Sequence, residues 1–119
     1  MGRASMLAVL KALVRTRDRV RLLQAAEELG TARDRDEYEL RLDVLEALIR
    51  DAWALSLGRS EASIVNRDLL NELRRIAEPM KSSKAASWLA AIEELRAALA
   101  VNINRRVATD ALFLGMAAA

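Results

Sequence analysis

Apolar residues recur at helical spacing along most of the chain, and short polar or glycine-containing segments separate them. The pattern predicts helices over about residues 5–14, 18–29, 36–57, 67–78 and 83–101, and a closing helix after Asn104. No useful stretch shows the strict alternation of apolar and polar residues that is typical of a strand. The sequence therefore predicts an all-α fold, a single irregular bundle of five to six helices with short connections.

The expected helix ends carry residues that often begin or end helices. Gly30 and Gly58 follow the second and third helices, where a glycine at positive φ commonly ends a helix. Asn66 and Asn104 precede the fourth and last helices, so we expect both to act as N-caps. Asp68 is well placed to interact with the dipole of the fourth helix.

The predicted third helix is the longest, and its apolar positions spread over more than one narrow stripe, which indicates a central helix. Arg50 and Asp51 interrupt this apolar stretch, and they either pair with another helix or lie on an exposed face. Trp53 and Trp88 are candidate interface anchors. Their helical spacing with Leu and Ile residues favours packing in the core instead.

Length and composition indicate one domain built around aliphatic side chains. Of 119 residues, 53% are apolar but only 3% are aromatic, so the core must consist mainly of Leu, Ala, Val and Ile. We expect residues 6–116 to form the domain and residues 117–119 a tail, while residues 1–5 are either a cloning remnant or the trace of a preceding module. No apolar run approaches the length of a transmembrane helix and no signal peptide is evident, so we expect a cytoplasmic protein with no membrane partner.

The absence of Cys and His excludes much chemistry. There can be no disulfide, thiolate nucleophile, Cys/His zinc site or histidine acid–base catalysis. The sequence also contains no glycine-rich phosphate loop, nucleophile elbow or metal motif. We therefore expect no catalytic residue, cofactor or metal, and we interpret the clusters of acidic residues as solvated helix faces.

A basic segment is the alternative functional signal. The chain carries 19 basic and 17 acidic residues, and four of its arginines lie at Arg15, Arg17, Arg19 and Arg21. These side chains could contact phosphates, which makes a helical nucleic-acid-binding module the alternative function. Alternate residues do not share one helix face, however, and no aromatic side chain is available there for base stacking. Direct contact with DNA is therefore not our main expectation.

Three motifs, in this order along the chain, are similar to those of one family. Residues 48–58 read Leu-Ile-Arg-Asp-Ala-Trp-Ala-Leu-Ser-Leu-Gly, residues 65–69 read Val-Asn-Arg-Asp-Leu, and residues 102–106 read Asn-Ile-Asn-Arg-Arg. Together they resemble the C-terminal domain of the delta-prime subunit of the bacterial DNA polymerase III clamp loader. Arg105 takes the place of a proline that is common in relatives, and the gamma/tau subunit has a related third domain. The residues that carry the resemblance are Arg50, Asp51, Asn66, Asp68, Asn102, Asn104 and Arg106.

The resemblance implies a non-catalytic collar domain for oligomerisation. In that family, the helical domains of five subunits pack into a ring, and AAA+ modules handle nucleotide and act on the sliding clamp during DNA replication. The partners would be the gamma/tau and delta subunits of a complex with ATPase activity. This sequence has no such module, so we expect it to be a fragment. The isolated domain is expected to stay monomeric, because an interface for different neighbours need not self-associate.

Overall fold

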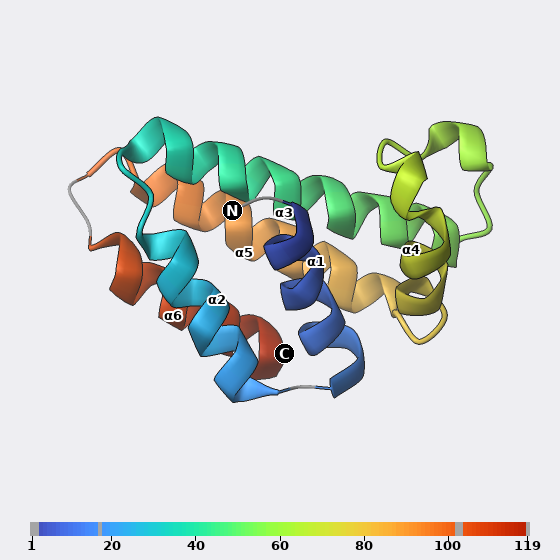
Figure 1. The fold of residues 1–119 in the computed structure, drawn as a ribbon, viewed down its shortest axis with the longest axis horizontal. Coiled ribbons are helices and arrows are strands. Elements are labelled where there is room, and N and C mark those ends of the chain that lie inside the picture. The colour runs from blue at the N-terminus through green and yellow to red at the C-terminus, as the bar shows by residue number, and fades with distance from the viewer. Residues whose placement is uncertain (1–2, 17, 102–103, 119) are drawn as a thin grey trace.

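The fold is elongated and entirely helical in the part of the chain that the structure describes. A computed structural model describes residues 3–16, 18–101 and 104–118 (Figure 1). The principal-axis extents are 40 × 25 × 23 Å and the Cα radius of gyration is 13.6 Å. The described residues contain no strand, which confirms the predicted all-α class.

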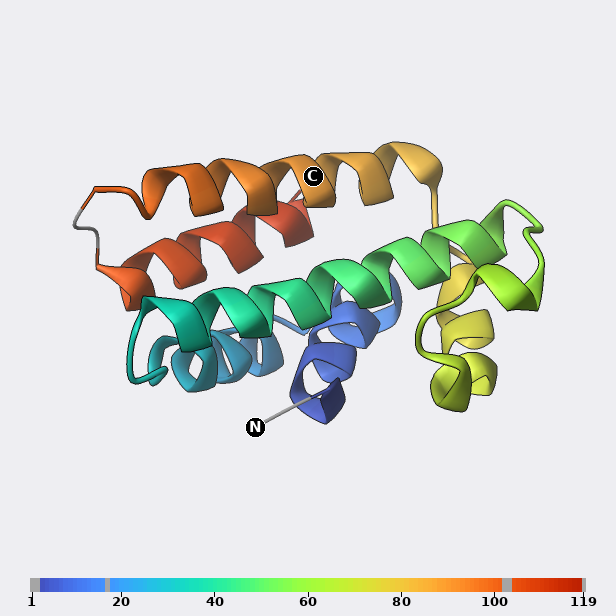
Figure 2. The ribbon, with the colours of Figure 1, turned by 90° about the horizontal axis from the view of Figure 1, so that it is seen from above.

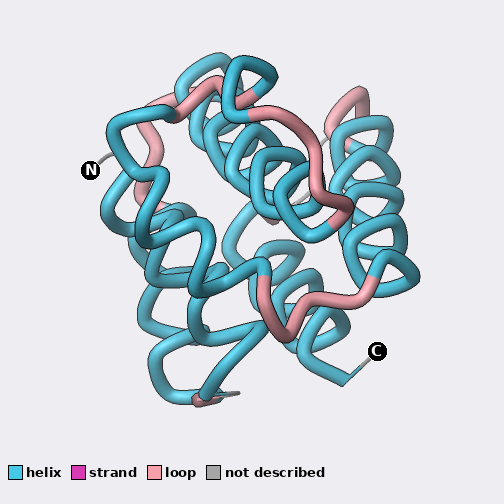
Figure 3. The backbone as a smooth tube through the Cα atoms, turned by 90° about the vertical axis from the view of Figure 1, so that its right-hand side faces the viewer, coloured by secondary structure: helices cyan, strands magenta, loops and turns pink. Residues whose placement is uncertain are grey.

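The chain forms six α-helices within the described residues, joined by short loops and three short turns of other helix types (Figure 3). The α-helices are α1 (Arg3–Lys11), α2 (Arg19–Gly30), α3 (Arg35–Ser56), α4 (Leu70–Ala77), α5 (Ser82–Ala98) and α6 (Arg105–Ala118). A π-helical turn, η1 (Ala12–Thr16), continues α1, and two 3₁₀ turns, η2 (Glu61–Ser63) and η3 (Arg67–Leu69), precede α4.

The long helix α3 is the centre of the bundle, as its broad apolar surface predicts. It contacts α1, α2, α4 and α5. Figure 2 shows α3 between a layer formed by α5 and α6 and a second group formed by α1, α2 and α4. The last two helices run antiparallel, and α6 also packs along α2 (Figures 1 and 2).

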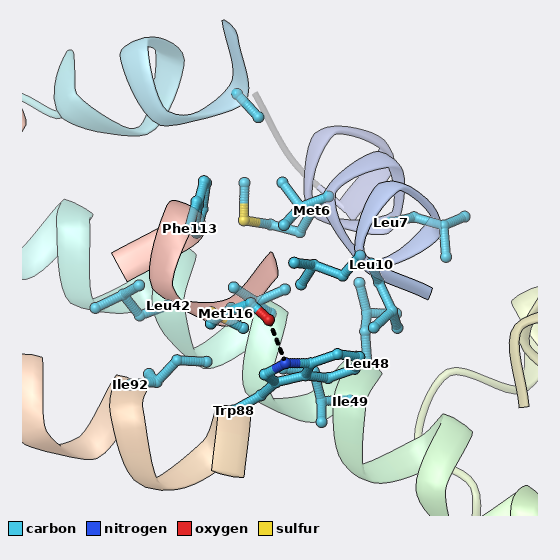
Figure 4. Packing of buried hydrophobic residues seen from close by; sticks show 14 of the residues in the cluster. Met6, Leu7, Leu10, Leu42, Leu48, Ile49, Trp88, Ile92, Phe113 and Met116 are labelled. Atoms are coloured by element: carbon cyan, nitrogen blue, oxygen red, sulfur yellow. Dashed lines mark hydrogen bonds between the residues drawn. The ribbon is translucent and has the colours of Figure 1, made fainter. Parts of the chain in front are cut away.

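One continuous core joins these helices. It contains Leu10 from α1, Leu48 and Ile49 from α3, Trp88 from α5 and Phe113 from α6, all buried (Figure 4). Most other core residues are aliphatic, as the composition requires. A core that draws on nearly every helix explains why short, individually marginal helices are stable here.

Local capping fixes where α2 and α3 begin. The backbone N–H of Arg21 donates to the Asp18 carboxylate (3.2 Å), and the backbone N–H of Glu37 donates to the Asp34 carboxylate (2.9 Å). Each bond satisfies a donor that the first helical turn cannot pair internally.

Two glycines differ in what they do. Gly58 follows α3 with φ of 74°, which confirms the expected left-handed helix end. The same expectation for Gly30 is wrong, because this residue is the last of α2 and its φ is not positive. A Cβ added at Gly30 would lie 3.3 Å from both the Cα and the Cβ of Arg106, so Gly30 instead permits close packing of the start of α6.

Gly115 lies within α6 and has no such contact. A Cβ built on it meets nothing within 4 Å, and its φ is not positive. We expect Gly115→Ala to stabilise the domain by about 0.5–1 kcal/mol, because alanine loses less backbone entropy in a helix. Urea denaturation of the variant measures this gain, and Gly58→Ala serves as the contrast, since its positive φ should make the same change destabilising. A loss of stability in Gly115→Ala would contradict the open space seen beside this residue.

Candidate functional site

Two of the motifs found in the sequence meet at a buried carboxylate. Asp51, in the C-terminal half of α3, has only 3% of its surface exposed. Its carboxylate accepts hydrogen bonds from the backbone N–H of Val65 (3.0 Å) and from the backbone N–H and side-chain amide of Asn66 (both 2.8 Å). Asp51 therefore fastens the loop after α3 back onto that helix. The Asn66 side chain makes no capping bond to the next helix, so the N-cap prediction for Asn66 is wrong.

The junction extends to the first helix through Arg3. The Arg3 guanidinium donates to both carboxylate oxygens of Asp68 (2.7 and 2.5 Å) and to the amide oxygen of Asn66 (3.3 Å). This pairing lowers the pKa of the Asp68 carboxyl below its usual value. Asp51, Asn66, Asp68 and Arg3 thus form one continuous network, which we call the Asp51 junction. Arg3 was not among the residues picked out from the sequence, because nothing local marks a partner 65 positions away.

Arg50, next to Asp51, belongs to a second polar cluster. It pairs with Glu46 (3.2 Å), one turn earlier on the same helix, and its side chain is 59% exposed. Of the two alternatives for Arg50, the exposed face is therefore the one observed. Glu46 has 2% of its surface exposed and also accepts a hydrogen bond from Arg96 of α5. Arg96 further pairs with Asp43 and lies 3.8 Å from Glu39. Arg96 therefore ties α5 to α3.

Burial and ion pairing act in opposite directions on Glu46. Removal from water raises the pKa of the Glu46 carboxyl, while the hydrogen bond and charge of Arg96 lower it; the net effect is a raised pKa. The ionised carboxylate is costly in this environment unless Arg96 accompanies it. Replacing Arg96 alone would therefore leave the buried Glu46 carboxylate without the charge that compensates its burial.

Asn104 and Arg106 form the corner that begins α6. The backbone N–H of Val107 donates to the Asn104 side-chain oxygen (3.2 Å), which confirms the predicted N-cap. Arg106 pairs with Glu27 of α2 (3.4 Å), beside the close contact with Gly30. The third motif residue of this corner, Asn102, lies outside the described residues.

Removal of the Asn104 cap has a modest expected cost. We expect Asn104→Ala to destabilise the domain by about 1 kcal/mol, because an N–H in the first turn of α6 loses its acceptor. Thermal and urea unfolding measure the change. Gln24→Ala, at an exposed position of α2, is a matched control that should stay within about 0.5 kcal/mol of the parent. Equal stability of Asn104→Ala and the parent would show that the cap contributes nothing.

The two tryptophans have different environments. Trp88 is buried in the core, and its indole N–H donates to the backbone carbonyl of Met116 (3.0 Å; Figure 4). Trp53 is half-buried and donates to the Ser82 hydroxyl (2.9 Å). Core packing is therefore confirmed for Trp88, while Trp53 only packs against the edge of the core.

A buried hydroxyl pair also links α3 to α6. The Thr109 hydroxyl donates to the carbonyl of Arg105 (2.6 Å), so the Tyr38 hydroxyl is the donor in its 2.6 Å bond to Thr109. Burial raises the pKa of Tyr38, and this effect outweighs the lowering by Thr109 and Arg105. The group is thus a neutral structural contact at physiological pH.

The basic segment is exposed. Arg15, Arg19 and Arg21 have no ion-pair or hydrogen-bond partner for their guanidinium groups among the described residues, while Arg17 lies outside them. Nearby, a groove of about 780 Å³ runs between α1, the start of α2 and the segment leading into α4. Half of its lining residues are alanine or leucine and half are charged. Most of the charged residues are paired, as Arg3 is with Asp68 and Lys11 with Glu72 (3.5 Å). The groove therefore shows no set of converging polar groups like that of a ligand site.

These contacts define a helical-bundle domain in which the polar side chains described above connect one helix to another. The described residues contain no group of three or more His, Cys, Asp or Glu that could hold a metal ion. None of their helices is both long and apolar enough to span a bilayer. Every buried polar side-chain atom among them has a hydrogen-bond partner. These residues therefore fix the relative positions of α1, α3, α4, α5 and α6.

Comparison with known proteins identifies the family. The family model described as "DNA polymerase III, delta subunit, C terminal" matches residues 3–114. The chain therefore belongs to the family of C-terminal domains of the DNA polymerase III delta subunit, a clamp-loader subunit. No curated protein and no solved structure gives a significant match.

Proposed function

We propose that this domain is a non-catalytic oligomerisation domain, the collar domain of a bacterial clamp-loader subunit. The observation that carries the proposal is the family match over residues 3–114. The fold supports it, because the polar residues of the three motifs serve packing between helices. The domain would hold its subunit in the cytoplasmic loader complex while other modules supply ATP hydrolysis.

The particular subunit follows from the same match. We propose the delta subunit, since the matching family model is that of delta. The delta-prime and gamma/tau assignments, which rest on the three sequence motifs, stay predictions. The partners are then the remaining loader subunits, gamma/tau and delta-prime, and their own helical domains would supply the contacts.

The test is to mix the domain with the other loader subunits of the same organism. Size-exclusion chromatography with light scattering should show a complex heavier than any component. A complex built mainly on apolar packing should persist at high salt, because salt screens charge pairs rather than burial. If the intact subunit assembles and the domain does not associate with any loader subunit, the proposal fails.

Nucleic-acid binding by the Arg15–Arg21 segment is the second candidate. The observation in its favour is that Arg15, Arg19 and Arg21 are exposed and that their guanidinium groups make no ion pair or hydrogen bond within the described residues. Binding through phosphates would give an affinity for duplex DNA that falls steeply with salt concentration. A triple Arg→Ala variant at these positions should then lose that binding. No binding at low salt would exclude this function.

A further inference from the structure

A small pocket lies where η1, the connection between α4 and α5, the start of α5 and the end of α6 come together. Its apolar lining includes residues from all of these segments: Leu13, Met80, Trp88 and Met116. Two lysines, Lys81 and Lys84, also line it. The volume is about 80 Å³, far below the roughly 300–1,000 Å³ of pockets that hold a whole small molecule. The pocket therefore matches one aliphatic side chain in size.

The apolar floor of this pocket is already formed in the folded chain. Leu13, Trp88 and Met116 are buried and belong to the continuous core. The indole N–H of Trp88 donates to the backbone carbonyl of Met116, which fixes the ring against the end of α6 (Figure 4). The thioethers of Met80 and Met116 are flexible and polarisable, so they adapt to aliphatic groups of different shape. An incoming side chain therefore meets a preformed apolar surface.

Both lysines of the pocket lack a counter-charge. Lys81 directly precedes α5 and Lys84 lies in its first turn, so the two occur within one helical turn. Neither ammonium group has an ion-pair or hydrogen-bond partner within the described residues. Glu78, the nearest acidic residue along the chain, is exposed and pairs with neither lysine. No described residue that lines the pocket is acidic, so its rim carries a local excess of positive charge.

We propose that this pocket binds the C-terminal residue of a partner polypeptide. The aliphatic side chain of that residue fills the apolar floor, and its free carboxylate lies between Lys81 and Lys84. The side chain contributes apolar burial, and the carboxylate forms charge-assisted hydrogen bonds with the two ammonium groups. This binding rests on the pocket alone and does not depend on the proposed place in a clamp loader.

The closeness of the apolar and basic parts favours a chain end over other occupants. Both parts line one pocket of side-chain size, so an occupant needs its apolar group and its negative charge within one residue. In a polypeptide, only the C-terminal residue carries an apolar side chain and a carboxylate on the same Cα. In an extended internal segment, neighbouring side chains point to opposite sides, so an acidic residue beside a leucine faces away. A fatty acid has both groups, but its acyl chain is too long for a volume of about 80 Å³.

Titration of the full chain with short acetylated peptides tests the proposal. The main probe is Gly-Ser-Gly-Leu with a free carboxylate, and NMR of isotope-labelled methionine methyl groups reports binding. The signals of Met80 and Met116 should shift, while that of Met6, which is buried and does not line the pocket, should not. We expect a dissociation constant on the order of 1 mM, because a single residue supplies the contacts. No shift at about ten times that concentration would overturn the proposal.

Changes in the peptide test each half of the site. Amidation of the C-terminus should weaken binding at least about tenfold, because the two lysines lose their counter-charge. Replacement of the terminal leucine by serine, with the carboxylate kept, should weaken binding by a similar factor, because the floor stays unfilled. Binding of either peptide as tight as that of the main probe would overturn the proposal. Equal binding of an amidated Gly-Leu-Asp-Gly peptide, or tighter binding of octanoate, would identify another occupant and would also overturn it.

A matched pair of substitutions tests whether the carboxylate lies at the rim. Lys84→Gln should weaken binding of the free-carboxylate peptide about tenfold and leave the weak binding of the amidated peptide unchanged. Arg59→Gln removes the same charge outside the pocket lining and should change neither. Circular dichroism verifies that each variant keeps its helical fold. Equal weakening by the two variants would show that net charge attracts the peptide, which would overturn the proposal.

Discussion

Asp51→Ala is expected to destabilise the domain by about 3 kcal/mol, because it leaves buried donors without an acceptor. The Asp51 carboxylate accepts the backbone N–H of Val65 and two donors of Asn66. Water does not readily replace these bonds at a site where Asp51 is 3% and Asn66 8% exposed. The thermal midpoint should fall by on the order of 10 °C, as scanning calorimetry would show.

Two further variants distinguish a lost hydrogen-bond acceptor from general damage. Asp51→Asn keeps the shape and one acceptor oxygen, so its cost should be smaller than that of Asp51→Ala but still above 1 kcal/mol. Glu94→Ala changes an exposed carboxylate on α5 that makes no ion pair or hydrogen bond within the described residues, and it should stay within about 0.5 kcal/mol of the parent. Similar stability of Asp51→Ala and Glu94→Ala would mean that the junction does not hold the loop.

The Asp51 junction also shows which parts of the site can be predicted from sequence. The motif residues Asp51, Asn66 and Asp68 lie in one network, but their contacts were not predicted. Asn66 precedes an apolar helical pattern, which is the usual position of an N-cap, and capping is the best local explanation. In the folded chain a buried carboxylate 15 positions away competes for the same amide. Burial of a charge costs so much that satisfying Asp51 outweighs capping a short helix.

The fold shows the same difference between local features, which the sequence predicts, and long-range contacts, which it does not. The helices, their approximate ends, the Asn104 cap and the central role of α3 follow from periodicity and local hydrogen bonding, which act within a few residues. In contrast, the close packing at Gly30 depends on Arg106, 76 positions away, and the orientation of the Arg96 side chain toward α3 depends on Glu46, 50 positions away. No local pattern marks such contacts. Arg96 shares its part of α5 with Glu93 and Glu94, which made a solvated charged face the simpler interpretation.

Function was inferred by a different route from fold. Composition excluded much catalytic chemistry but could not select among non-catalytic roles, because a helical bundle is compatible with many of them. The three motifs selected the clamp-loader family at the delta-prime subunit. The family match over residues 3–114 supports a clamp-loader C-terminal domain but not the delta-prime assignment, because the matching family model is that of the delta subunit. The structure then shows that the motif residues bind other parts of the domain, so residues that contact partners must be sought on other surfaces.

The second large effect is expected for Arg96→Met, which removes the α5 partner of the buried Glu46. Methionine keeps much of the aliphatic stem, so the change mainly removes charge and hydrogen bonds. Near neutral pH we expect a loss of about 3 kcal/mol, because an ionised carboxylate that is 2% exposed loses its main compensation. Arg50→Met is the matched control, since Arg50 pairs with the same carboxylate from a side chain that is 59% exposed, and it should cost under about 1 kcal/mol.

The dependence on pH separates this explanation from a simple loss of packing. Below the ordinary pKa of 4.5, Glu46 is protonated in both the folded and the unfolded chain, and the charge penalty is absent. Because the folded pKa is raised, the folded chain binds the extra proton above 4.5, and stability falls as the pH rises through that window. Without Arg96 the pKa rises further, so the window extends toward neutral pH. The difference in unfolding free energy between the parent and Arg96→Met should therefore widen from about pH 4 to pH 7 in urea titrations. An equal difference in unfolding free energy between the parent and Arg96→Met at pH 4 and at pH 7 would show that Arg96 acts through packing alone.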